Sequence, residues 1–117
     1  MLFRGRVLDK SRDERLDGVT MTTREEMTMT TRLQLGSTYA TRGAIASLHP
    51  EDMSRALLRH ASGDWGDVPA PDALANEAAL QCEGRLLSSY PLGNGVRVWA
   101  ITEADRTVTT LLLPDEY

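Results

Sequence analysis

The stretch Gly84–Pro114, with the sequence GRLLSSYPLGNGVRVWAITEADRTVTTLLLP, decides the fold of this chain. It contains two turn segments between runs of β-branched and large apolar residues. The first, Pro91–Gly95 (PLGNG), carries two glycines and an asparagine, which accept positive φ. The second, Ala104–Arg106, has no glycine, but the Asp105 side chain can accept hydrogen bonds from turn amides. The pattern predicts three antiparallel strands, a β-meander.

Side chains alternate between the two faces of a sheet along each strand. In the predicted middle strand, the set expected to face the core is Val96, Val98, Ala100 and Thr102. The last strand, residues 108–113, is apolar on both faces at its end. We therefore expect it to be central in the sheet or covered on both sides.

The residues before this stretch predict helices. Thr41–Leu48 has the composition of a short helix capped by Thr41. A second helix starts at His49–Asp52 (HPED), which places proline at the first helical position and two acids in the first turn, and it ends at Gly63. A third helix is expected over residues 73–83. Its buried face is expected to hold Leu74, Ala75, Ala78, Ala79 and Cys82, opposite Asn76, Glu77 and Gln81.

The segment Arg32–Tyr39 alternates Leu33 and Leu35 with polar residues and could add a short edge strand. Helices that precede a meander of strands are typical of the α+β class. We therefore predict two or three short helices packed on a three- or four-stranded antiparallel sheet.

The first 31 residues differ from the rest of the chain. They mix charges with few apolar residues and repeat the tetrapeptide MTTR at Met21 and Met29. No apolar periodicity runs through them, so we expect a disordered or weakly docked leader before a single α+β domain over residues 32–117. Met1, Met21, Met27 and Met29 are all possible translation starts, and the sequence leaves this choice open.

Composition narrows the classes of function. The single cysteine, Cys82, excludes an internal disulfide and favours a reducing cytoplasm. We expect no membrane segment, because no apolar run approaches the roughly 20 residues that span a bilayer. The net charge of −4 disfavours nonspecific binding of duplex DNA, which needs a basic surface. The acids Asp64, Asp67 and Asp72 match no metal-binding loop, so neither a metal nor another cofactor is predicted.

Three segments together carry a resemblance to a known family: GDWG at Gly63–Gly66, GRLLSSY at Gly84–Tyr90, and WAITEADRTVTTLLLPDEY at Trp99–Tyr117. With them the chain resembles a family of small plasmid-related proteins of bacterial mobile genetic elements, whose members are labelled hypothetical. The resemblance covers Leu35–Tyr117. It implies a genomic setting and no established activity.

The sheet alone also resembles the end of the barnase, colicin and RelE-type ribonucleases. The resemblance places Arg85 at the phosphate-binding arginine of the GR-L-S strand, and Arg106 at the turn position where barnase has its catalytic histidine. Arginine is a poor general acid near neutral pH, so His60 or Glu103 would have to supply the acid or base. His60 also suits a structural role as a cation in the last turn of a helix.

Other side chains are candidates for binding. Arg85, Arg97 and Arg106 could converge on a phosphate or carboxylate, or could pair with Glu103 and Asp105 on a solvated face. Two tryptophans could stack on a base or on a partner's side chain. We expect Trp65 to pack between helix and sheet, and we leave Trp99 open. Thr109 completes the predicted polar rim of Arg, Thr and acidic groups.

Two functional hypotheses follow, and the sequence does not decide whether the protein is an enzyme. The first is a cytoplasmic accessory protein of a mobile element that binds another macromolecule, most simply a protein, as an inhibitor of a host defence system. The alternative is a ribonuclease toxin with RNA as substrate.

Overall fold

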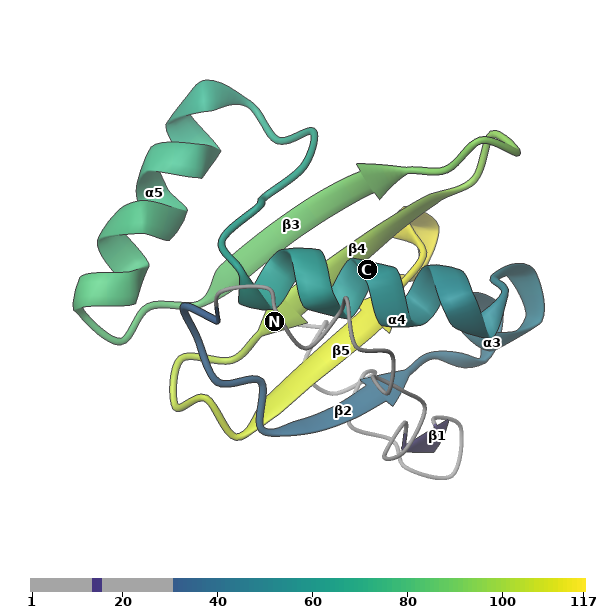
Figure 1. Ribbon diagram of the computed structural model, residues 1–117, viewed down its shortest axis with the longest axis horizontal. Helices are drawn as coiled ribbons and strands as arrows, with labels where there is room; N and C mark the ends of the chain where they lie inside the picture. Colours follow the sequence, from purple (N-terminus) through teal and green to yellow (C-terminus); the bar gives the residue numbers. More distant parts are fainter. Residues whose placement is uncertain (1–13, 16–30) are drawn as a thin grey trace.

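The computed structural model describes residues 14–15 and 31–117, and it shows an α+β fold (Figure 1). The sheet has five strands in the order β1-β2-β5-β4-β3. The strands are β1 Glu14–Arg15, β2 Ser37–Ala40, β3 Leu86–Pro91, β4 Arg97–Thr102 and β5 Val108–Leu112. The helices are α3 Arg42–Ser47, α4 Pro50–Ala61 and α5 Ala70–Gln81, followed at the C-terminus by the 3₁₀ turn η1 Pro114–Glu116. The predicted fold class is confirmed.

The C-terminal meander forms as predicted. β3 pairs antiparallel with β4, and β4 pairs antiparallel with β5. In the first turn Gly95 has a φ of 87°, and Asn94 accepts a hydrogen bond from the Val96 amide. In the second turn Asp105 accepts from the backbone amide and the hydroxyl of Thr107. β5 lies between β2 and β4, which confirms that the last strand of the meander is interior.

The sheet is mixed, whereas an antiparallel sheet was expected. The predicted edge strand forms at Ser37–Ala40, but it pairs parallel with β5. The reason lies in the connection between β2 and β3, which contains all three helices and crosses over the sheet. Such a crossover returns the chain in the same direction, and two hairpins then reverse it twice. β5 must therefore run parallel to β2.

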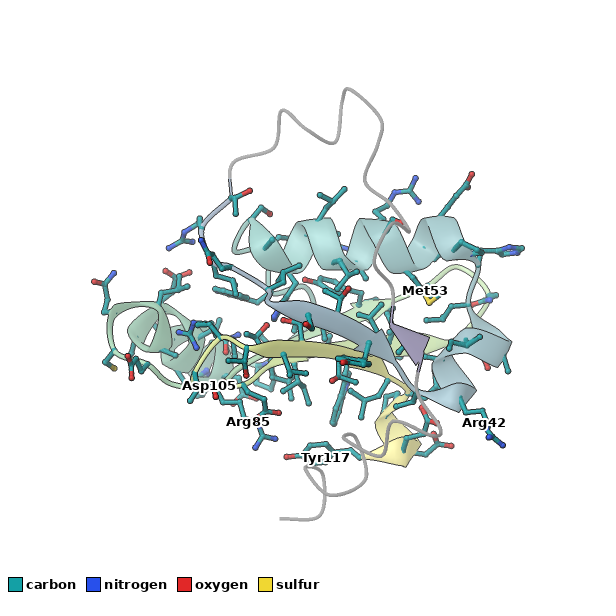
Figure 2. All side chains as sticks on the ribbon, turned by 90° about the horizontal axis from the view of Figure 1, so that it is seen from below. Arg42, Met53, Arg85, Asp105 and Tyr117 are labelled. Carbon is teal, nitrogen blue, oxygen red and sulfur yellow. The ribbon has the colours of Figure 1, made fainter. Side chains whose placement is uncertain are left out.

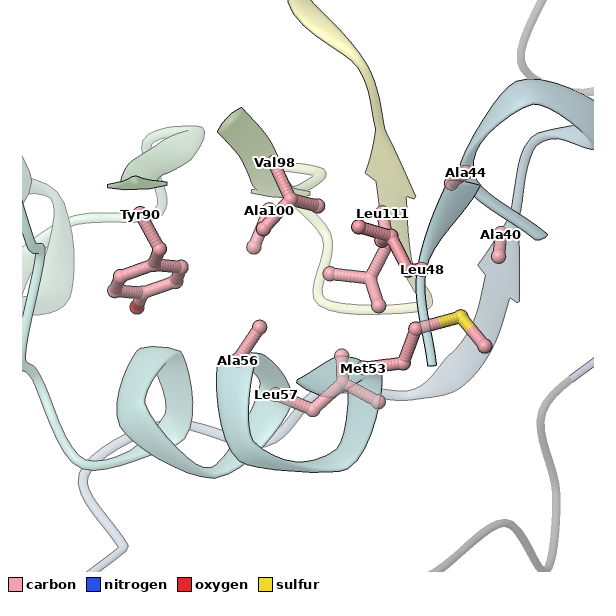
Figure 3. Close-up of a cluster of buried hydrophobic side chains, with 10 residues drawn as sticks. All are labelled: Ala40, Ala44, Leu48, Met53, Ala56, Leu57, Tyr90, Val98, Ala100 and Leu111. Carbon is pink, nitrogen blue, oxygen red and sulfur yellow. The ribbon is translucent and has the colours of Figure 1, made fainter. Parts of the chain in front are cut away.

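One face of the sheet is covered by α4 (Figure 1). Figure 3 shows Met53, Ala56 and Leu57 pointing from this helix toward the strands. All three are buried in one cluster, and the members that the sheet contributes are Ala40, Tyr90, Val98, Ala100 and Leu111. α4 is amphipathic because these apolar positions recur at helical spacing. The core-facing set predicted for the middle strand is confirmed by Val98, Ala100 and Thr102, which are fully buried.

The opposite face of the sheet is apolar too. Ile101 and Leu112 are fully buried there. Trp99 lies on this face and packs edge to face against Tyr117, with ring centroids 5.4 Å apart. Figure 2 shows Tyr117 on the side of the sheet away from α4. The Glu116 carboxylate holds the C-terminal turn by accepting from the Thr41 hydroxyl and the amide of Gly43 at the start of α3.

The helix α5 presents a different face to the sheet from the one expected. Asn76 and Ala79 are its buried residues, whereas Leu74, Ala78 and Cys82 are exposed. The cause is the Asn76 side chain, whose amide donates to the Leu87 carbonyl at 2.8 Å and whose oxygen accepts from the Leu87 amide at 3.2 Å. This pair of bonds imitates a neighbouring strand and caps the outer edge of β3 at Leu87.

The leader predicted for residues 1–31 lies outside the described residues, apart from Glu14–Arg15 and Thr31. Glu14 and Arg15 pair antiparallel with Ala40 and Tyr39 of β2. Within the described residues, every helix is too short or too polar to cross a bilayer.

Candidate functional site

His60 is part of α4, and its side chain points between this helix and the sheet, where it is the centre of a buried polar network. Its Nδ1 atom is 2.6 Å from the Ser88 hydroxyl on β3, and its Nε2 atom is 2.9 Å from the Thr102 hydroxyl on β4. The Thr102 hydroxyl is 2.7 Å from that of Thr109 on β5, which in turn donates to the carbonyl of Leu35 at 2.7 Å. The network therefore links one helix to three consecutive strands of the meander.

The donor and the acceptor of each hydrogen bond in this network follow from the bond between Thr109 and Leu35, in which the Thr109 hydroxyl donates to a carbonyl. A hydroxyl has a single proton, so Thr109, which donates to Leu35, must accept from Thr102. Thr102 then accepts from Nε2–H of His60. Burial, together with the nearby Arg106 charge, lowers the pKa of His60 to about 4, so the ring is neutral near pH 7, with its proton on Nε2. Nδ1 is then left to accept from the Ser88 hydroxyl.

The same geometry gives His60 a structural role, but as a neutral ring in the core and not as the cation expected in the last turn of the helix, because burial disfavours the charged form. The side chain is 0% exposed, and both ring nitrogens are committed to hydroxyls. Ser88 and His60 are close enough for a nucleophile and base, but Ser88 is 0% exposed as well, and Thr102 takes the place that a carboxylate has in a catalytic triad. Thr109, a predicted binding residue, belongs to this network and is fully buried.

Arg106 is engaged with the backbone. Its guanidinium donates to the carbonyls of Ala79, Gly84, Glu103 and Ala104, at distances from 2.6 to 3.3 Å. The residue itself has a φ of 62°, in the left-handed region that usually takes glycine, asparagine or aspartate. Arg106 therefore fastens the turn between β4 and β5 to the end of α5.

Four of the candidate residues gather at one end of the sheet. Because Arg106 reaches both Gly84 and Glu103, the start of β3 and the turn after β4 lie side by side, and this brings together Arg85, Glu103, Asp105 and Arg106. Figure 2 shows Arg85 and Asp105 at this end. Arg85 donates to the Tyr117 hydroxyl at 2.9 Å and lies over the same ring. Hydrogen bonds from Thr107 lower the pKa of Asp105.

Arg97 and Trp65 lie elsewhere. Arg97 is at the other end of β4, opposite Pro91, where it donates to Asp67 and to the Ser89 hydroxyl. Trp65 is buried with Leu33, Ala79 and Leu86, and its indole donates to Glu77. The prediction that Trp65 packs between helix and sheet is confirmed. The three arginines do not converge on one point.

The loop around Trp65 closes part of the β3 edge. The backbone amide of Ser89 donates to the Trp65 carbonyl, and the backbone carbonyl of Ser89 accepts from the Asp67 amide. Asp64 forms a two-point ion pair with Arg59, whose hydrogen bonds lower the pKa of Asp64. The guanidinium of Arg59 also stacks 4.4 Å from the centre of the Tyr90 ring. These contacts account for the acids of the loop as turn and ion-pair residues.

The outer face of α5 was missed by the sequence analysis. We use this name for the exposed residues Ala70, Leu74, Ala75, Ala78 and Cys82. Leu74 is 71% exposed, more than any other large hydrophobic side chain in the described part of the chain. The signal available in the sequence was Asn76, because an amide in the middle of an alanine-rich helix needs hydrogen-bond partners if it is buried.

No family model, curated protein or solved structure matches this chain. Among residues 14–15 and 31–117, no three His, Cys, Asp or Glu side chains are grouped closely enough to hold a metal ion. Two surfaces are available: the sheet end with Arg85, Glu103 and Asp105, and the outer face of α5.

Proposed function

We propose that this protein is a small cytoplasmic accessory protein of a mobile genetic element, and that it acts by binding another protein to inhibit a host defence system. The genomic setting comes from the family resemblance of Leu35–Tyr117. Binding through the outer face of α5 is supported by one observation above all, the exposure of Leu74.

The exposure of Leu74 is costly for an isolated chain. Burying a leucine side chain in full is worth about 1.5–3 kcal/mol relative to leaving it in water. With 71% of its surface exposed, Leu74 retains about 1–2 kcal/mol of this free energy for an interaction with a partner. That amount corresponds to roughly a 5- to 30-fold change in a dissociation constant. Leu74 therefore offers apolar area whose burial by a partner would be favourable.

The test is recovery of a partner from the native host. Tagged wild-type protein should copurify with a stoichiometric partner, Leu74→Asp should lose it, and Gln34→Asp should keep it. Gln34 is exposed and lies outside α5, and its replacement adds the same charge, so it is the matched control. Isolation of the wild-type protein as a lone monomer under gentle conditions would refute the proposal. Equal recovery with Leu74→Asp would refute the role of α5.

The ribonuclease alternative is supported by the gathering of Arg85, Glu103 and Asp105 at one end of the sheet. Arg85 would bind phosphate there, and Glu103 would act as the acid or base, since His60 is enclosed in the core. Its test is growth after induced expression of the wild type and of Arg85→Ala. Harmless wild-type expression, together with intact RNA after incubation with purified protein, would reject it.

A further inference from the structure

The face of the sheet away from α4 is buried, although the described chain covers little of it. On this face Ile101 and Leu112 are 0% exposed. Leu87 and Trp99 pack beside them within the sheet, and Tyr117 lies against Trp99 on this side (Figure 2). A sheet face that lacks a second layer leaves its side chains in contact with water. The complete burial of Ile101 and Leu112 therefore requires a further layer here.

The short strand β1 brings residues 1–13 to this face. Glu14, the first residue of β1, pairs with Ala40 at the end of β2. Because β2 runs parallel to β5, the start of β1 lies at the end of the sheet where Trp99 pairs with Leu112. Three strand spacings of about 4.8 Å separate β1 from β4, which is about 14 Å, whereas a chain as long as residues 1–13 reaches about 40 Å when extended. Residues 1–13, which lie outside the described part of the chain, are therefore long enough to cross the whole face.

The chain that follows β1 leads to the other side of the sheet. The backbone amides of Arg32 and Leu33 both donate to the carbonyl of Ala61, the last residue of α4. Residues 16–30 thus join the edge of the sheet to the side that α4 covers. The segment that is available for the opposite face is the one before β1.

The composition of residues 1–13 suits this face. Five of them are apolar: Met1, Leu2, Phe3, Val7 and Leu8. Four are basic and two are acidic, whereas residues 14–117 hold nine basic and fifteen acidic residues. The apolar side chains can cover Ile101 and Leu112, and the positive charge favours contact with the acidic remainder of the molecule. A tethered segment also has an advantage over a separate partner, because a short tether gives an effective concentration on the order of millimolar.

We infer that residues 1–13 bind, within the same molecule, to the sheet face formed by Leu87, Trp99, Ile101 and Leu112, and that they form its second layer. A segment bound there keeps this apolar face away from other proteins. The inference goes beyond the proposed function and does not involve the outer face of α5, so each of the two proposals can fail without the other.

A spin label in the segment tests this placement by NMR. Gly5→Cys in a Cys82→Ser background gives the full ¹⁵N-labelled chain one thiol, which is coupled to a nitroxide whose broadening of amide signals falls steeply with distance. We expect the amides of Ile101 and Leu112 to lose most of their intensity, and those of α4, on the far side of the sheet, to keep most of theirs. Unbroadened Ile101 and Leu112 signals, or a stronger loss in α4, would overturn the inference. Broadening of unlabelled ¹⁵N protein by added spin-labelled protein without ¹⁵N would also overturn it, because the segment would then bind a second copy.

Two pairs of substitutions in the spin-labelled chain complete the test. Val7→Asp with Leu8→Asp should restore most of the lost intensity, because the charges disfavour burial of the segment. Thr22→Asp with Thr23→Asp adds the same charge outside the segment and should leave the loss unchanged. Equal broadening in both would overturn the inference, and if the first pair prevents folding, the spin label in the unsubstituted segment decides alone. If the label result fails while Leu74→Asp still loses the partner from the host, the proposed function stands.

Discussion

Replacing Thr109 or Thr110 by valine should change the stability of the protein in opposite directions. The two residues are neighbours on β5, and both are buried, at 0% and 1% exposure. They point to opposite faces of the sheet. Thr109 donates to the Leu35 carbonyl and accepts from Thr102, whereas the Thr110 hydroxyl has no hydrogen-bond partner among residues 14–15 and 31–117.

The magnitudes follow from the cost of unpaired polar groups. Valine has nearly the shape of threonine, so Thr110→Val mainly removes a buried hydroxyl whose desolvation costs about 1–3 kcal/mol. We expect the free energy of unfolding to rise by about 1 kcal/mol. Thr109→Val removes a satisfied hydroxyl and leaves the Thr102 proton and the Leu35 carbonyl without partners. At about 1–3 kcal/mol for each of the two orphaned groups, we expect a loss of roughly 2–6 kcal/mol.

Urea denaturation followed by circular dichroism measures both changes. The slope with denaturant should stay constant, so that the difference in midpoint reports stability alone. The two variants should differ by at least about 3 kcal/mol when the expected changes are combined. A destabilised Thr110→Val, or shifts of the same sign in both variants, would show that the assigned hydrogen bonds do not describe the protein.

Three further predictions concern the contacts around the core. The free energy of unfolding should fall by about 3 kcal/mol between pH 6.5 and pH 4. Over this range His60 binds a proton in the unfolded chain, whereas in the folded protein its pKa is about 4 and the ring stays largely neutral. Denaturation curves of His60→Gln should lack this part of the pH dependence. Arg106→Ala should lower the free energy of unfolding by about 2–4 kcal/mol in thermal unfolding, because four hydrogen bonds to backbone carbonyls are lost. Arg106→Gly should recover about 1 kcal/mol of that loss, because glycine adopts the positive φ of this position without the strain that alanine has there. Asn76→Ala should expose the Leu87 amide to faster hydrogen exchange and cost about 2 kcal/mol, and unchanged exchange would contradict the role of Asn76 at the β3 edge.

Local signals in the sequence were enough for the turns and for the presence of the three described helices, although α5 begins at Ala70 and not at residue 73. Pro91–Gly95 and Ala104–Arg106 form the turns of the meander, as their residue types predict. Thr41 caps α3 through its side chain, and Pro50 begins α4. These features depend on residues that are close in the chain, where propensity and hydrogen-bonding chemistry act directly.

Features that depend on distant contacts could not be predicted. The parallel pairing of β2 with β5 joins Ser37 to Val108, and four residues of strand carry no information on direction. The functions of the candidate polar residues were also hidden. His60 has the chemistry of an acid or base, but its partners Ser88 and Thr102 lie 28 and 42 residues away, and only the fold brings them together.

The exposure of Leu74 follows from the way in which the edge of β3 is closed. Turning α5 to bury Leu74 would gain at most about 2 kcal/mol of apolar burial. The same rotation would carry Asn76 away from Leu87 and leave a backbone amide, a backbone carbonyl and the side-chain amide without partners. Those groups cost about 1–3 kcal/mol each when they stay buried. The closed sheet edge therefore holds α5 in an orientation that keeps its apolar outer face available, so the fold itself maintains the surface that we propose for binding.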